Sequence, residues 1–274
     1  GGNITDDTLA NALPALFPSM PAGVLNSLAE GIGYIFSQWR ADPSSVEGLH
    51  ESYSLPNHRI SHSTVDHGLP LTFWRSVGHS YTSFAVESMM DELAEQANLD
   101  PVAFRLKNTQ GNPRMHNVIQ QAAKLMATMA VPEGHHLGFA CHNSFFTDVA
   151  EIAEISVENN DIKVHKVTCV ADVGIAVNPD IVRAQLEGAV MFALTATLYG
   201  EIDLDNGAVV QSNFHDYPML RMDEAPAVDV VIVESGTEPT GIGEPGVPPL
   251  APAIANAVYK ATGKRLRQLP LRLA

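Results

Sequence analysis

Glu244 has the clearest chemical setting in the chain, because it stands between Gly243 and Pro245 in the segment 241–246, GIGEPG. Gly243 lets another group approach the backbone closely, and Pro245 fixes the direction in which the chain leaves. Residues 247–250 are apolar and predict low solvent access for this segment. A carboxylate in such a pocket suits a general base that works near neutral pH. A glutamate that caps the following helix is an equal alternative on the residues alone.

The same segment also matches G-x-G-x-x-G, the pattern of a dinucleotide-binding loop. That loop needs a helix that opens directly on it and a ribose-binding acid about twenty residues further on. Pro245, Pro248 and Pro249 interrupt the segment, and no acidic residue follows Glu244. The sequence therefore excludes a Rossmann-type nucleotide site at this position.

Two further polar stretches have the composition of a ligand-binding surface. Residues 74–80 lead into a predicted helix, so their backbone amides and Arg75 can meet an anion at the helix N-terminus. A salt bridge between Arg75 and one of the many surface acids is the alternative. Gln185 and Gly188 place an amide and a residue without a side chain on one helix, as the close approach of a large ligand requires.

Composition narrows the class of protein. The 274 residues are 45% hydrophobic and carry a formal net charge of −15, which disfavours nucleic acid or an anionic membrane surface as the main partner. Cys141 and Cys169 are the only cysteines, too few for a disulfide scaffold, a Cys-ligated zinc site or an iron–sulfur cluster. His58, His62 and His67 match no zinc spacing, so we predict no metal ligand among them. No apolar run approaches the ~18 residues of a membrane span.

Hydrophobic periodicity and turn signals predict the elements that must position these residues. We expect helices at about 24–39, 83–98, 101–106, 115–130, 179–198 and 251–262, and strands at 149–157, 162–170 and 228–234, the last of them buried. Polar turns at 158–161 and 205–207 join extended runs into hairpins. Helices and strands mix without regular βαβ alternation, which favours an α+β fold. Residues 1–55 form an irregular apolar N-terminal segment, and residues 56–274 form the main body.

Longer motifs occur in order along the chain. They are residues 74–80 with 84–92, 100–105, 172–179, 185–188, 211–218 and 241–256. Together they resemble the molybdenum-binding large subunit of the xanthine oxidase family. The branch that they resemble most contains the isoquinoline 1-oxidoreductase β-subunit and membrane-associated aldehyde dehydrogenases. This resemblance implies a domain of the aldehyde oxidase and xanthine dehydrogenase type.

The resemblance also implies roles for particular residues. Glu244 takes the place of the active-site base beside molybdenum, in the oxidation of an aldehyde or an N-heterocycle with oxygen derived from water. The cofactor it implies is molybdopterin, in the cytosine dinucleotide form, with molybdenum. The residues expected to lie against that cofactor are Arg75, Ser76, Gly78, His79, Gln185, Gly188 and Gly243.

One departure from the family pattern concerns completeness. The family's Gly-Gln-Gly and Gly-Gly-Gly-Phe-Gly loops do not occur in this sequence, so the chain resembles the C-terminal part of the large subunit. We therefore expect the remainder of the large subunit, on the same or a separate chain, and an iron–sulfur small subunit as partners. A non-catalytic remnant that acts as a binding or scaffolding module is the alternative, although Glu244 and Gln185 are kept in their expected contexts.

Substrate contacts, location and association complete the expectations. His142, Phe145 and Phe146 are candidates to line a funnel for a small-molecule substrate, with core packing as the alternative for the two phenylalanines. The branch implies the periplasm or inner-membrane surface of a bacterium, with the cytoplasm as alternative. Apolar residues at 10–40 lack a polar face and predict an interface of about 2,000 Å² or more, unless they pack in the chain's own core. They are Leu13, Leu16, Phe17, Leu25, Leu28, Ile32, Ile35 and Phe36.

Overall fold

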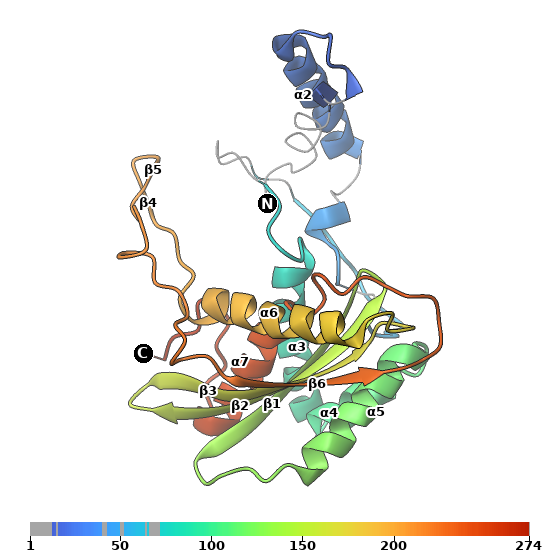
Figure 1. Ribbon diagram of the computed structural model, residues 1–274, viewed down its shortest axis with the longest axis vertical. Coiled ribbons are helices and arrows are strands. Elements are labelled where there is room, and N and C mark those ends of the chain that lie inside the picture. Colours follow the sequence, from blue (N-terminus) through green and yellow to red (C-terminus); the bar gives the residue numbers. More distant parts are fainter. Residues whose placement is uncertain are drawn as a thin grey trace.

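The computed structural model describes residues 13–14, 16–39, 43–49, 52–63, 65 and 72–273 (Figure 1). Its helices are α2 (Ala22–Trp39), α3 (His79–Gln96), α4 (Pro101–Asn108), α5 (Pro113–Thr128), α6 (Pro179–Leu198) and α7 (Leu250–Thr262), with a short 3-10 helix η1 (Pro43–Ser45). Its strands are β1 (His135–Ser144), β2 (Thr147–Glu158), β3 (Asp161–Asp172), β4 (Leu204–Asp205), β5 (Ala208–Val209) and β6 (Ala227–Val233).

The main sheet has the strand order β1-β2-β3-β6. The first three strands form an antiparallel meander, in which Phe139 lies opposite Ile152 and Ile152 lies opposite Thr168. Strand β6 pairs with β3 in parallel, so the chain between them must cross over the sheet. Helix α6 lies in this crossover, followed by the small β4–β5 hairpin that projects from the body (Figure 1). The α+β expectation is confirmed.

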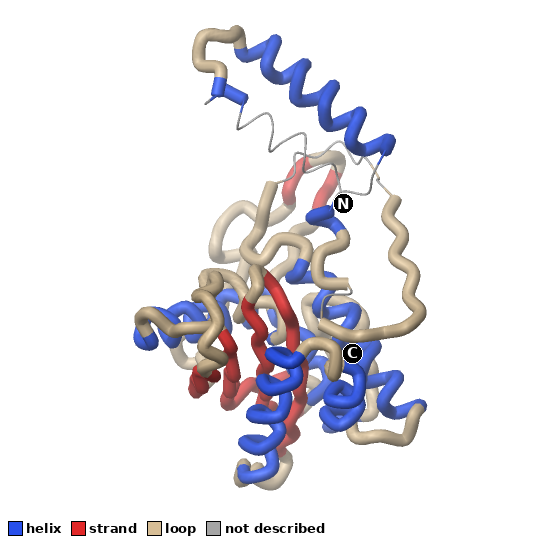
Figure 2. Tube along the Cα trace, turned by 90° about the vertical axis from the view of Figure 1, so that its right-hand side faces the viewer, coloured by secondary structure: helices blue, strands red, loops and turns tan. Residues whose placement is uncertain are grey.

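Helices cover both faces of the sheet, as Figure 2 shows. Helices α6 and α7 pack on one face, where residues such as Val149 and Cys169 meet Leu186 and Ile254. Helices α3, α4 and α5 lie on the other side, where Ile152 belongs to the second core. Each core buries apolar side chains from alternate positions of the same strands, which is the expected pattern for a sheet covered on both faces.

Local signals set most element boundaries. The Asp100 carboxylate accepts hydrogen bonds from the amides of Val102 and Ala103, both at 2.9 Å, so it caps α4 as its sequence predicts. Asn178 caps α6 in the same way, ahead of a proline at the first helical position. Gly263 ends α7 with φ of 70°, the left-handed conformation that glycine adopts without steric cost.

The structure corrects three of the predicted elements. Strand β1 was not predicted, although Leu137, Phe139 and Cys141 alternate with the period of a strand. Helix α3 begins at His79, four residues earlier than expected. Strand β6 is half-buried rather than buried, because it forms the edge of the sheet.

Helix α6 is the one helix in the described part of the chain whose length and composition would allow it to cross a membrane. One face of it, with Leu186, Val190 and Leu194, is buried against α7 and the sheet. The other side of the helix is exposed and carries both polar and apolar residues, among them Gln185, Gly188 and Phe192. This arrangement is that of a helix that packs on a protein core.

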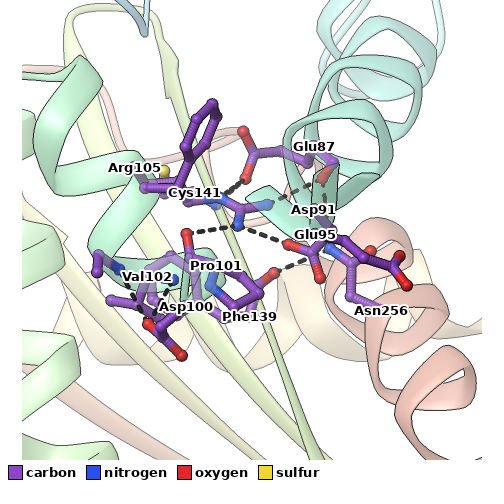
Figure 3. Close-up of polar contacts among 12 residues, drawn as sticks. Glu87, Asp91, Glu95, Asp100, Pro101, Val102, Arg105, Phe139, Cys141 and Asn256 are labelled. Atoms are coloured by element: carbon purple, nitrogen blue, oxygen red, sulfur yellow. Dashed lines mark hydrogen bonds and ion pairs between the residues drawn. The ribbon is translucent and has the colours of Figure 1, made fainter. Parts of the chain in front are cut away.

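A buried ionic cluster joins the helices to the sheet (Figure 3). Arg105 of α4 donates to Glu87 at 2.9 Å and to Asp91 at 2.6 Å, both on α3. The backbone amide of Cys141 in β1 donates to the same Glu87 carboxylate at 2.9 Å, and Tyr53 donates to its other oxygen. This cluster fixes α3, the helix that follows the polar stretch 74–78.

Candidate functional site

The turn formed by residues 74–77 lies against the segment that contains Glu244, although the two are 168 residues apart in sequence. The backbone amide of Ser76 donates to Oε2 of Glu244 at 2.7 Å, and the Ser76 hydroxyl donates to the backbone carbonyl of Glu244 at 2.8 Å. Ser76 and Val77 have φ of 73° and 46°, in the left-handed region that non-glycine residues rarely adopt. Such strain persists only where surrounding contacts hold it.

Arg75 turns toward the backbone of the same segment. Its Nε and Nη2 atoms donate to the carbonyl oxygen of Gly243 at 2.8 and 2.5 Å. Nη2 also approaches the side-chain oxygen of Gln185 at 3.3 Å and its backbone carbonyl at 3.4 Å. The guanidinium lies over the ring of Phe192 on α6, and burial lowers the pKa of Arg75. Arg75 therefore links the turn, α6 and the Glu244 segment, rather than a surface acid.

Glu244 is half-buried, at the boundary between exposed residues before it and buried residues after it. Residues 247–250 are buried as predicted, and residues 245–246 are buried with them. Gly246 packs so closely on α6 that a Cβ atom there would lie 2.9 Å from Ala189 and Leu186. The amide of Val247 donates to the Glu244 carbonyl at 3.0 Å. The carboxylate is thus fixed on a rigid support with one side toward solvent.

The surface beside Glu244 is open. Gln185 and Gly188 lie on the exposed face of α6, and a Cβ atom at Gly188 or Gly243 would meet nothing within 4 Å. Trp74 and Phe192, both exposed, extend this surface with rings 4.6 Å apart. Four of the predicted cofactor residues, Arg75, Gln185, Gly188 and Gly243, therefore gather around one uncovered face.

Gly78 and His79 were expected to lie against the cofactor and His142 to line the substrate funnel, but all three residues are buried inside the fold. Gly78 lies against the backbone of Ser44, where a Cβ atom would come within 1.8 Å of the carbonyl oxygen. The buried rings of His79 and His142 are joined by a 2.9 Å contact between Nδ1 and Nε2. Burial, together with the charge of His79, lowers the pKa of His142 to about 3, so this ring is neutral. These three residues support the turn from inside the fold, and His142 has no face toward a substrate.

Phe145 and Phe146 form the turn between β1 and β2, with φ of 51° and 63°. Phe146 is 82% exposed, so it is not packed in the core, and Phe145 lies beside His79 and near Gly241. The hydroxyl of Thr147 donates to the Gly241 carbonyl at 2.6 Å. The aromatic turn is therefore joined to the segment that leads into Glu244.

Sequence reasoning missed the residues that brace this turn. Arg114 at the start of α5 donates to the Phe146 carbonyl at 3.0 Å and to the Asp172 carboxylate at 3.1 Å. Asp172 also accepts from the hydroxyl of Ser235 at 2.7 Å, and so ties the ends of β3 and β6 together. Asp172 belongs to the motif at 172–179, which is the signal that could have identified it. His58 and His62 join no metal cluster within the described residues, and His67 lies outside them.

Comparison with known proteins identifies the family of this chain. A family model described as molybdopterin cofactor-binding domain matches residues 82–226, and a second with the same description matches 36–109. Isoquinoline 1-oxidoreductase subunit beta of Brevundimonas diminuta is 34% identical over 247 residues, which cover 88% of this chain and 32% of that protein. A membrane-bound aldehyde dehydrogenase [pyrroloquinoline-quinone] of Gluconacetobacter polyoxogenes is 32% identical, over 73% of this chain and 29% of its own length.

Among solved structures, quinoline 2-oxidoreductase from Pseudomonas putida 86 has the same fold over 72% of this chain and 51% of its own, with a TM-score of 0.61 at 12% identity. The chain spans about a third of the length of the two curated relatives named above. The match at 82–226 alone covers more than half of the chain. The chain therefore belongs to the molybdopterin cofactor-binding domains of the xanthine oxidase family.

Proposed function

We propose that this chain supplies the catalytic base and one wall of the cofactor site in a molybdenum-dependent oxidoreductase that oxidises an aldehyde or an N-heterocycle. The observation that carries the proposal is the Glu244 carboxylate, held by the Ser76 amide at the edge of the open α6 face. Two relatives, an isoquinoline 1-oxidoreductase and an aldehyde dehydrogenase, support the two substrate classes.

The residues beside Glu244 fit a large, flat and polar cofactor such as molybdopterin. Gly188 and Gly243 leave open space where any other residue would place a side chain. The side-chain oxygen of Gln185 faces Arg75, so the amide nitrogen of Gln185 keeps both hydrogens for a ligand. Bound molybdopterin, which we expect in the cytosine dinucleotide form, would supply the two-electron redox chemistry and the metal.

Glu244 would act on the proton of the water-derived oxygen that attacks the substrate carbon. Its carboxylate accepts that proton, and the Ser76 contact holds it in place throughout. The neighbouring turn with Phe145 and Phe146 offers exposed aromatic surface to an apolar or aromatic substrate. The neutral His142 would support this turn through His79 rather than touch the substrate.

The chain spans about a third of the length of these relatives, and its exposed apolar surfaces are available for contact with the remaining parts of the enzyme. Leu13 and Leu25 are buried in a small cluster of their own, whereas Leu16, Phe17 and Leu28 are exposed; the side chains of Ile35 and Phe36 lie outside the described part. An apolar pocket of about 620 Å³ borders Trp74 and Phe192. We propose that the rest of the large subunit covers these surfaces, that iron–sulfur clusters lie on a small subunit, and that the enzyme works in the bacterial periplasm or at the inner membrane.

Purification of the protein from its own cells, with the chains that accompany it, tests the proposal. Molybdenum and pterin are expected in near-equimolar amounts. Gly188→Leu should deplete both, because its side chain enters the open face. Ala103→Leu is the matched control, since Ala103 is an exposed helical residue of α4, on the other side of the sheet. An assembly that holds neither molybdenum nor pterin would mean that the chain is a non-catalytic binding or scaffolding module.

A further inference from the structure

The geometry points to Arg75 and Ser76 as positioning residues for Glu244, which fix the carboxylate so that its Oε1 atom receives the proton. We refer to these two residues as the clamp. The inference rests on the proposed function, in which Glu244 is the base. It assigns Arg75 and Ser76 a role toward the protein backbone in place of the contact with the cofactor that the family resemblance implies.

Arg75 holds the peptide unit that precedes Glu244. Two of its nitrogen atoms donate to one acceptor, the carbonyl oxygen of Gly243, at 2.8 and 2.5 Å. Hydrogen bonds from a charged donor are roughly twice as strong as neutral ones, and the planar guanidinium fixes their direction. The longer contacts to Gln185 tie the same guanidinium to α6. The peptide plane between Gly243 and Glu244 therefore cannot change its orientation without loss of both short contacts.

Ser76 holds the other side of the same residue. Its hydroxyl donates to the carbonyl of Glu244, and its amide donates to the carboxylate. The Ser76 side chain is buried, and its backbone is left-handed at φ of 73°. Glycine would occupy that conformation at lower cost, so the serine is explained by the hydroxyl contact that glycine lacks. Together the clamp fixes the backbone on both sides of Glu244 and one of its two carboxylate oxygens.

This arrangement distinguishes the two carboxylate oxygens. Oε2 accepts the Ser76 amide at 2.7 Å, and a proton placed on Oε2 would compete with that contact. No residue in the described part of the chain donates to Oε1. Oε1 is therefore the atom that takes up the proton during turnover. A small movement of the carboxylate would misplace this atom, and a misplacement of about 1 Å can reduce the rate ~100-fold.

The first experiment uses the purified native assembly with Arg75→Met, Arg75→Lys and the control Arg267→Met. Arg267 is an exposed arginine outside the candidate site, and it pairs with Glu92 at 2.8 Å. For Arg75→Met we expect kcat to fall ~10- to 100-fold per bound molybdenum, with KM and the molybdenum and pterin contents unchanged. Arg75→Lys should restore part of kcat, since lysine keeps one charged donor. Arg267→Met should match the wild type.

The second experiment measures hydrogen exchange in the protein without reliance on turnover. Arg75→Met should speed exchange of the Ser76 and Val247 amides, because both donate to Glu244, while the amides of α5 keep their protection. Ser76→Gly keeps the backbone amide and removes the strain, so we expect a melting temperature close to that of the wild type but a lower kcat. Ser76→Ala, which keeps the strain, should lower both.

Loss of molybdenum or pterin in Arg75→Met, or a raised KM with unchanged kcat, would overturn the clamp and make Arg75 a ligand of cofactor or substrate. Unchanged exchange at Ser76 would also overturn it. If the proposed function is wrong, the result is different: Glu244→Gln would keep full turnover, regardless of the turnover of Arg75→Met. If Arg75→Met contradicts the clamp but Glu244→Gln is inactive, Glu244 remains the base and only the positioning role of Arg75 and Ser76 is wrong.

Discussion

Arg105 and Arg75 each lie beside a glutamate, and the surroundings of these two arginines differ in almost every respect. Arg105 is fully buried, and its partners Glu87 and Asp91 are buried with it (Figure 3). Arg75 is half-buried, and its short hydrogen bonds go to a backbone carbonyl rather than to a carboxylate. The neighbouring Glu244 keeps one oxygen without a donor from the described residues.

This difference distinguishes a carboxylate with a structural role from one with a role in a reaction. In the buried cluster each Glu87 oxygen has at least one donor, so the carboxylate cannot accept a proton without loss of a contact. At the site, the contacts fix the position of Glu244 and leave part of it available. A carboxylate with every oxygen satisfied holds helices together, whereas one that is fixed and incompletely satisfied can take part in a reaction.

The largest expected effect comes from Arg105→Met. It leaves the charges of Glu87 and Asp91 buried without their partner, which costs about 3–5 kcal/mol. Thermal or chemical unfolding of the purified protein measures the loss. Arg267→Met is the control, because Arg267 pairs with Glu92 at 2.8 Å on the surface, and an exposed pair is worth about 0–1 kcal/mol. Equal losses in the two variants would contradict the architectural role of the buried cluster.

A second buried acid sharpens the comparison because it has almost no partner. Among the described residues, only the Cys169 thiol donates to the carboxyl group of Glu151 in β2, at 3.4 Å to Oε1, and Oε2 has no hydrogen-bond partner. Burial raises the pKa of Glu151 to about 8 from an ordinary value of 4.5. Between pH 4.5 and 8 the unfolded chain loses this proton and the folded protein keeps it, so stability falls as pH rises.

Glu151→Gln removes this titration. The free energy of unfolding of the variant should gain on that of the wild type by roughly 1.4 kcal/mol per pH unit across that window and level off above pH 8. Denaturant unfolding at pH 5, 7 and 9 measures the difference between the two proteins. A difference that does not change with pH would show that Glu151 ionises normally in the folded protein.

Two glycines extend the comparison to residues without side chains. Gly78→Ala would place a Cβ atom within 1.8 Å of the Ser44 carbonyl, so we expect a loss of about 1–3 kcal/mol and displacement of η1. The melting temperature and a crystal structure of the variant check this. A variant as stable as the wild type would mean that residues 43–45 do not support the turn.

The smallest expected change in the free energy of unfolding is a gain, and it comes from Gly188→Ala. Gly188 lies inside α6, and an added Cβ atom there would meet nothing within 4 Å. A glycine in a helix interior costs about 0.5–1 kcal/mol relative to alanine. Gly188→Ala should therefore stabilise the isolated fold by about that amount while it weakens retention of molybdopterin in the assembly. Thermal unfolding and pterin analysis of one preparation measure both. A Gly188→Ala variant that is less stable than the wild type would show that Gly188 is required for packing of α6 and not for contact with the cofactor.

Local signals in the sequence predict much of this fold. The caps at Asp100 and Gly263 and the turn at 158–161 lie where the structure has them. Strand β1 was missed because it contains no β-branched residue and because Gly138, His142 and Asn143 lie within it. These residues are tolerated because α7, His79 and Ser52 contact them from other parts of the chain.

The candidate site was predictable in its members and not in its contacts. The segment at 241–246 identifies Glu244, and the family resemblance adds Gln185 and Gly188. The contact between Ser76 and Glu244 joins residues that are far apart in sequence, and no local pattern encodes it. The same holds for Arg75, for which an anion or a surface acid was expected and a backbone carbonyl is found.

Glu244→Gln in the purified native assembly tests the central claim most directly. Glutamine keeps the side-chain size and an oxygen for the Ser76 amide, and it cannot accept the proton. We expect molybdenum and pterin contents equal to those of the wild type and turnover per bound molybdenum lower by about 100- to 10,000-fold. Equal cofactor content with turnover close to that of the wild type would contradict the assignment of Glu244 as the base.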